Sequence, residues 1–146
     1  MLDVGAGHGV ITAALLDLDL DLRIVAVESH AARVAALKAR FGDRVIVVRA
    51  DAADLRLPRR PFHVVANPPF VVSTPLLRRL VHPGSRLETA HVVLQQQAAR
   101  RWSGSDAPAV ARWGRTFTAT LGPGVPRNAF RPPPQVDARV LVLRRR

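Results

Sequence analysis

The segment Asn67-Pro68-Pro69-Phe70 constrains the fold more than any other stretch of this chain. It follows the apolar, largely β-branched run Phe62–Ala66, which predicts a buried strand. Because proline cannot extend a strand ladder, the chain must leave the sheet stiffly at this point. Ligands bind at such strand ends in open α/β sheets. A polar amide beside an aromatic ring suits a flat substrate with an amino group, such as adenine or cytosine; the alternative is a loop that only ends a strand.

The start of the chain predicts a strand, a glycine-rich turn and a helix in direct succession. The predicted strand is Leu2–Val4, and the turn after it contains Gly5, Gly7 and Gly9. Val10–Leu16 then has helical spacing. This order opens a nucleotide-binding βαβ unit, in which glycines let the backbone approach a ligand near the free amides of the helix. The glycines alone are weak evidence for a nucleotide-binding unit, so this prediction depends on the residues that follow.

Acidic residues end the next two predicted strands. Arg23–Val27 runs into Glu28, 19 residues beyond Gly9, near the spacing at which a carboxylate bonds ribose hydroxyls. The alternative is a solvated glutamate at a helix start. Arg44–Val48 predicts a third buried strand, and Asp51 follows it closely, where it could accept a hydrogen bond from an adenine amino group.

Helix signals complete the first half and the middle of the chain. Ser29 is predicted to cap a helix over 31–38, and Ser73-Thr74-Pro75 predicts a cap followed by a first-position proline. We further expect a helix over 76–81, strands over 89–94, 116–121 and 136–143, a short basic helix over 95–102, a loop over 103–111 and a stiff basic loop over 127–134. Five strands with intervening helices, then two without, predict a Rossmann-like α/β fold: a mostly parallel doubly wound sheet with an antiparallel edge hairpin.

Charge separates the two halves of the chain. Residues 1–54 hold 6 basic and 8 acidic side chains, whereas residues 55–146 hold 16 basic and 3 acidic ones, and only Lys38 among the basic residues is a lysine. A GC-rich genome could explain arginine over lysine, but not the scarcity of acids in the second half. Because the guanidinium group matches phosphate oxygens, we expect a nucleic-acid partner.

Composition excludes several classes of protein. The chain has no cysteine, its five histidines lack metal-ligand spacing, and no apolar run reaches the roughly 18–20 residues of a membrane span. No signal peptide is recognisable at the start. We therefore expect a cytoplasmic protein with no metal and no membrane association, and a monomer.

The ordered motifs resemble those of a known family. A glycine-rich turn, an acid after each of the next two strands and Asn-Pro-Pro-Phe after the fourth resemble the adenine-N6 methyltransferases. The tail, with Leu94-Gln95, Arg101 and the run 125–137, resembles the rRNA adenine dimethyltransferases, most of all the Erm group of macrolide–lincosamide–streptogramin resistance enzymes. These methylate one adenine in the peptidyl-transferase region of 23S rRNA.

This resemblance implies a role for each motif residue. In the implied S-adenosylmethionine pocket, Glu28 holds the ribose and the cofactor's adenine is read by Asp51 with the Ala52 amide. The remaining implied contacts to the cofactor are Gly5, Gly7, Gly9 and Asn67. Asn67 and the Pro68 carbonyl would accept hydrogen bonds from the target amino group, Phe70 would stack on the base, and the tail would supply Phe130 to the base pocket and Arg127 and Arg131 to the RNA.

Other functions remain open on the sequence. They are a small-subunit rRNA adenine dimethyltransferase, the same chemistry on DNA or on a protein glutamine amide, and a non-catalytic RNA-binding remnant. Family members normally carry a segment before the first strand and a helical domain after the last. We therefore expect a single methyltransferase domain over 1–146, truncated before strand one and without the C-terminal helical domain.

Overall fold

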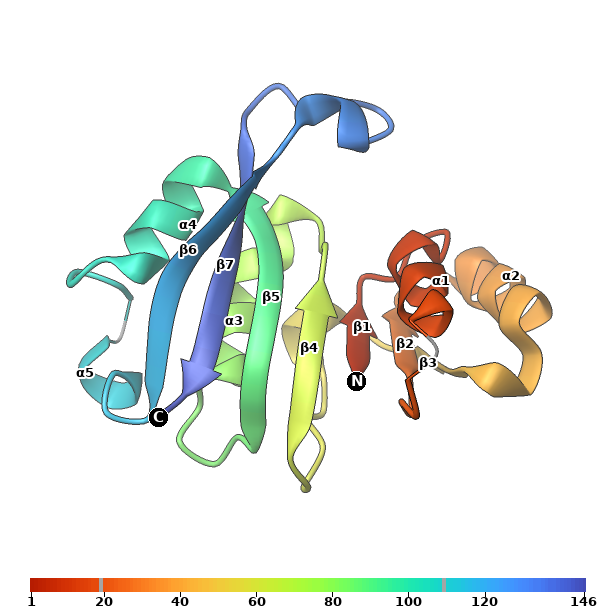
Figure 1. Ribbon diagram of the computed structural model, residues 1–146, viewed down its shortest axis with the longest axis horizontal. Helices are drawn as coiled ribbons and strands as arrows, with labels where there is room; N and C mark the ends of the chain where they lie inside the picture. Colours follow the sequence, from red (N-terminus) through yellow and green to blue (C-terminus); the bar gives the residue numbers. More distant parts are fainter. Residues whose placement is uncertain (19, 109) are drawn as a thin grey trace.

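Figure 1 shows the computed structural model of the protein, which describes residues 1–18, 20–108 and 110–146. The strands are β1 (Leu2–Val4), β2 (Val25–Glu28), β3 (Ile46–Arg49), β4 (Phe62–Ala66), β5 (Leu87–Gln95), β6 (Phe117–Val125) and β7 (Ala138–Arg145). The α-helices are α1 (Val10–Asp17), α2 (Ala31–Phe41), α3 (Ser73–Leu80), α4 (Gln96–Ser103) and α5 (Val110–Trp113). Short 3-10 turns are η1 (Gly42–Arg44), η2 (Ala52–Asp54), η3 (Phe70–Val72) and η4 (Arg127–Ala129).

The strands of the described residues form one sheet of seven, in the order β3-β2-β1-β4-β5-β7-β6. Strands β1 to β5 pair in parallel, and β7 lies antiparallel between β5 and β6. Since parallel strands share their direction, the turns after β1, β2, β3 and β4 all emerge at the same edge, which we call the carboxyl edge. This arrangement confirms the predicted Rossmann-like sheet with an antiparallel hairpin.

Two apolar layers hold the helices on the sheet. On one face, Leu76, Leu77 and Leu80 of α3 are fully buried against the central strands, and each such burial contributes roughly 1.5–3 kcal/mol. On the other face, Leu37 and Phe41 of α2 pack with α1 and β2. Figure 1 shows α3 behind the strands and α1 in front. The helices therefore sit on both faces and leave the carboxyl edge open.

The prediction that the third strand is buried was wrong. β3 is the last strand of the sheet, and Ile46 and Val48 are 40% and 38% exposed. Val47, which points to the opposite face, packs with the layer under α2. An apolar run was interpreted as burial on both faces, but a strand at the edge needs only one covered face.

Both predicted helix caps were also wrong. The residue before α2 is His30, and the Ser29 hydroxyl instead lies 3.4 Å from Glu28 Oε1. Helix α3 begins at Ser73 itself, because η3 runs straight into it and places Val72 at the cap position. Pro75 is then the third helical residue, where a missing N–H still costs no intrahelical hydrogen bond.

The last strands run further than their sequence suggests. β6 continues through Gly122-Pro123-Gly124, with a register shift between Leu121 and Gly124. Proline is tolerated there because β6 is an edge strand with a bulge. Within the predicted loop 103–111, α5 begins at Val110, and Ala109 lies outside the described residues. No helix of the described ranges is long and apolar enough to cross a membrane.

Candidate functional site

A cavity of about 960 Å³ opens at the carboxyl edge of the sheet. Its walls come from the turns after β1, β2, β3 and β4 and from the loop between β6 and β7. Ten of the predicted site residues line it: Gly5, Gly7, Glu28, Asp51, Ala52, Asn67, Pro68, Phe70, Phe130 and Arg131. The structure thus gathers at one opening residues that lie more than a hundred positions apart in the chain.

Two of the predicted site residues, Gly9 and Arg127, do not line this cavity. Gly9 is buried with φ +80°, and a Cβ placed on it would lie 2.6 Å from the Phe41 ring and 2.8 Å from the Leu37 side chain. The bare Cα therefore lets α1 start close beneath α2. Gly9 supports the turn through packing rather than by lining the cavity.

Gly5 joins the first turn to the Asn-Pro-Pro-Phe segment. Its φ is +78°, and a Cβ there would stand 3.1 Å from the Pro68 Cα and 3.3 Å from the Asn67 carbonyl oxygen. A side chain at this position would be strained in its backbone and crowded by Pro68. Glycine is therefore required for the two turns to meet inside the cavity.

Glu28 is fixed at the end of β2 by backbone amides. Gly7 N donates to Glu28 Oε2 and His30 N to Glu28 Oε1, both at 2.9 Å, although the residue is only 5% exposed. Burial opposes the charge, but these hydrogen bonds and the nearby Arg33 guanidinium outweigh it and hold the pKa of the Glu28 carboxyl below its usual value. The cavity thus contains a firmly ionised acceptor.

Asp51 lies beyond β3 at the same cavity. Its Oδ1 accepts a 2.8 Å hydrogen bond from Ala53 N, which starts the turn η2. The carboxylate is exposed, and the Ala52 beside it also lines the cavity. Asp54, at the end of the same turn, is exposed to solvent and pairs with Arg79 of α3.

The Asn-Pro-Pro-Phe segment leaves the sheet as predicted, because β4 ends at Ala66. Pro68 is buried against the glycine turn, while Asn67 and Phe70 are half-buried and line the cavity. The opposite wall is the β6–β7 loop, from which Phe130 and Arg131 reach the cavity. The turn after β4 and the β6–β7 loop thus supply an amide and two aromatic rings to the cavity. The two carboxylates come from the ends of β2 and β3, which lie on the other side of β1 in the sheet, so they define the opposite end.

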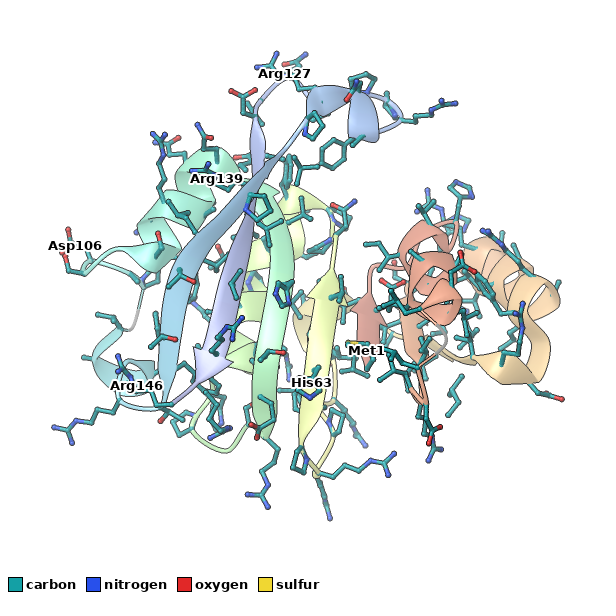
Figure 2. The ribbon with its side chains drawn as sticks, viewed as in Figure 1. Met1, His63, Asp106, Arg127, Arg139 and Arg146 are labelled. Atoms are coloured by element: carbon teal, nitrogen blue, oxygen red, sulfur yellow. The ribbon has the colours of Figure 1, made fainter. Side chains whose placement is uncertain are left out.

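Arg127 lies on the other side of the β6–β7 loop. Its Nε is 2.9 Å from Asp137 Oδ1, and it lines a smaller pocket beside the cavity. Figure 2 shows Arg127 at the tip of this loop, beyond the carboxyl edge. Its predicted contact with RNA would therefore be made outside the main cavity.

Two residues in or beside the site were missed from the sequence. Asp3 of β1 is fully buried, accepts a 2.5 Å hydrogen bond from Thr12 Oγ1, and leaves Oδ1 without a partner in the described ranges. Burial raises the pKa of its carboxyl, and the Thr12 hydrogen bonds only partly offset this. An acid inside an apolar strand just before a glycine turn was the available signal. Arg33, which lines the cavity from α2, gave no comparable signal.

Metal ligands do not gather in this site. Within residues 1–18, 20–108 and 110–146, no three histidine, cysteine, aspartate or glutamate side chains are grouped to hold an ion.

The sheet order, the cavity at the carboxyl edge and the turns that line it define a class I methyltransferase domain. More narrowly, the chain belongs to the ribosomal RNA adenine dimethylase family, whose model matches residues 1–146.

Individual relatives agree with this assignment. An rRNA adenine N-6-methyltransferase from Corynebacterium diphtheriae is 36% identical over 148 residues, which is 99% of this chain and 57% of that protein. The mycinamicin-resistance protein MyrB of Micromonospora griseorubida is 38% identical over 150 residues, covering all of this chain and 47% of MyrB. The crystal structure of the 23S rRNA methyltransferase ErmE superposes with a TM-score of 0.86 at 26% identity, covering 99% of this chain and 60% of that one. The chain thus spans about half the length of the curated relatives it matches.

Proposed function

We propose that this chain transfers a methyl group from S-adenosylmethionine to the N6 amino group of one adenine in 23S rRNA, and so confers macrolide-type resistance. The observation that carries the proposal is that one cavity of about 960 Å³ has carboxylates at one end and the amide and aromatic rings at the other. Such a cavity can accommodate a methyl donor and a target base side by side.

The residues at the carboxylate end fit the cofactor. Glu28 offers an ionised oxygen pair for ribose hydroxyls, and Asp51 with the Ala52 amide offers an acceptor and a donor for an adenine ring. Gly5, which also lines the cavity, carries no Cβ that would press on Pro68 and Asn67. When bound, S-adenosylmethionine supplies an electrophilic methyl group.

Asn67 and Pro68, at the other end of the cavity, can make the amino nitrogen of the target adenine a better nucleophile. An adenine amino nitrogen is poorly nucleophilic because its lone pair is delocalised into the ring. Acceptors at Asn67 Oδ1 and the Pro68 carbonyl favour the pyramidal amino group, whose lone pair is localised. Preorganised contacts of this kind are typically worth about 100- to 1,000-fold in kcat.

The aromatic rings can offset the free energy needed to unstack the target adenine. A paired adenine must leave its stack to enter the cavity, which costs a few kcal/mol. Phe70 and Phe130 are partly exposed at the mouth, and stacking on such rings contributes roughly 1–3 kcal/mol per base. The excess of 16 basic over 3 acidic side chains in residues 55–146 would attract the phosphates of the RNA.

The choice of 23S rRNA is supported by the names of MyrB and ErmE, a resistance protein and a 23S rRNA methyltransferase. The members of the family are ribosomal RNA adenine dimethylases, a class that is not tied to one ribosomal subunit. We place the reaction in the cytoplasm, carried out by a monomer.

The test is expression in a macrolide-sensitive bacterium, with primer extension across the peptidyl-transferase region and with in vitro transfer of labelled methyl to naked 23S RNA and to 30S subunits. We expect reduced susceptibility, a block at one adenine and label in 23S RNA. Label in 30S subunits alone would assign the enzyme to the small subunit. Absence of label, together with no heat on titration with S-adenosylmethionine, would identify a non-catalytic RNA-binding remnant.

A further inference from the structure

A second, smaller pocket lies beside the main cavity. It has a volume of about 310 Å³, at the lower end of the range for small-ligand sites. Its polar lining consists of Gln95, Gln96, Gln97, Arg127, Gln135 and Asp137. The chain contains four glutamines, and all four line this pocket. We call it the glutamine notch.

The notch and the main cavity share two walls. Val93 lines the cavity and Gln95 lines the notch, and both point to the same face of β5, so that they stand about 7 Å apart. The β6–β7 loop turns Phe130 towards the cavity and Arg127 towards the notch. A polymer that places one unit in the cavity can therefore reach the notch with a unit one or two positions along.

The glutamine amides are available to a ligand. Among the described residues, none of the four side-chain amides makes a hydrogen bond, and Gln95, Gln97 and Gln135 are exposed. Each amide offers both donors and an acceptor. The notch thus presents neutral donors and acceptors that no group of the described protein engages, on an otherwise strongly basic half of the chain.

The charged pair in the notch favours a nucleobase over a phosphate. Arg127 alone would attract a phosphate, but its Nε is 2.9 Å from Asp137 Oδ1, and this carboxylate would repel an anion. Asp137 is held in place by its carbonyl oxygen, which accepts a 2.8 Å hydrogen bond from Gln96 N. Amides together with a carboxylate match the mixed donors and acceptors at the edge of a base.

We propose that the glutamine notch binds the base of an unpaired nucleotide one or two positions from the target adenine in the same strand. The notch thereby makes the enzyme selective for the identity of that neighbour. The inference rests on the proposed function, since it assumes that the target base occupies the main cavity.

The experiment measures both binding and methylation of RNA fragments in which each nucleotide within two positions of the target adenine is changed in turn. Fluorescence anisotropy gives affinities, and labelled methyl transfer gives kcat/KM. At one flanking position we expect the wrong base to lower affinity and kcat/KM roughly 5- to 150-fold. The double variant Gln97→Ala/Gln135→Ala should reduce that discrimination to less than about 3-fold.

A matched control is available on the same loop. Asn128 is an exposed amide in η4 that lines neither pocket, so Asn128→Ala should keep the discrimination of the unsubstituted protein. Thermal melting and titration with S-adenosylmethionine verify that each variant is folded.

The outcomes separate the inference from the proposed function. Methylation that ignores every flanking base, or selectivity that survives in the double variant, overturns the inference alone. Selectivity lost only when the flanking phosphate is replaced by a methylphosphonate would also overturn it, because the notch would then bind phosphate. Selective binding that disappears in the double variant, without methylation of any fragment, supports the notch and contradicts the proposed function.

Discussion

The Gly7 backbone amide donates a 2.9 Å hydrogen bond to Glu28 Oε2 and so ties the turn after β1 to the end of β2. The two residues lie 21 positions apart, yet this contact holds the glycine turn against the carboxylate at the cavity wall. The same carboxyl group therefore supports the turn and remains at the cavity as an ionised acceptor.

Replacing Glu28 should weaken cofactor binding. Glu28→Gln keeps the shape but removes the charge, and hydrogen bonds to charged groups are worth about 1.5–3 kcal/mol. Calorimetry should therefore show a roughly 10- to 150-fold loss of affinity for S-adenosylmethionine. Glu88→Gln, near the amino end of β5, is the matched control and should bind as the unsubstituted protein does. Equal affinities for both variants would remove Glu28 from the cofactor site.

The same substitution predicts a pH dependence of stability. Because the pKa of Glu28 is lowered in the folded protein, its carboxylate stabilises the fold above the unfolded pKa of about 4.3, and this stabilisation is lost as the pH falls through the folded pKa. The difference in unfolding free energy between the unsubstituted protein and Glu28→Gln should thus shrink as denaturation is repeated from pH 7 towards pH 3. A difference that stays constant over this interval would contradict the assigned shift.

The carboxyl group of Asp3 should affect the pH dependence of stability in the opposite direction. Burial raises the pKa of its carboxyl, so the ionised form costs stability once the pH exceeds the unfolded pKa, and the full cost is reached above the folded pKa. Asp3→Asn should retain the contact with Thr12 without that cost. Denaturation at several pH values should show Asp3→Asn gaining stability over the unsubstituted protein as the pH rises. A variant that is less favoured at pH 7 than at pH 4 would be inconsistent with this account.

Two glycine substitutions should distinguish crowding of a neighbouring side chain from backbone strain. Gly9→Ala would press on the Phe41 ring, so a loss of about 1–3 kcal/mol of stability is expected beyond the backbone strain. Gly42→Ala adds a Cβ with no neighbour within 4 Å, so it should lose only the roughly 1–3 kcal/mol of backbone strain at φ 54° and ψ −136°. Equal losses in urea denaturation would indicate that the contact with α2 is unimportant.

Much of the fold could be predicted because its signals are local. Leu2–Val4, the glycine turn and α1 follow each other directly, and the prolines after Ala66 end β4 wherever that strand lies in the sheet. The exposure of Ile46 depends instead on which strand forms the sheet edge, and that is decided by pairing across the chain. Continuation of β6 through Pro123 likewise depends on its place at the edge.

The residues of the site likewise fall into those that the local sequence predicts and those set by contacts between separate elements. Glu28, Asp51 and Asn67 could be identified because each directly follows an apolar run or lies within a few residues of its end. From their motif positions, Gly9 was expected in the cofactor pocket and Arg127 at the RNA, but contact with Phe41 and the ion pair with Asp137 set their surroundings. Neither contact is visible in the local sequence, because both join separate elements.

Asn67 is the residue on which the proposed chemistry depends most. The most direct test is the single-turnover rate of methyl transfer to a 23S rRNA fragment, measured at saturating S-adenosylmethionine for Asn67→Ala and for the control Asn128→Ala. We predict that Asn67→Ala slows transfer by about 100- to 1,000-fold while cofactor affinity changes by less than about tenfold, and that the control keeps the full rate. Transfer by Asn67→Ala at the rate of the control would contradict the assignment of the Asn67–Phe70 turn as the site of reaction.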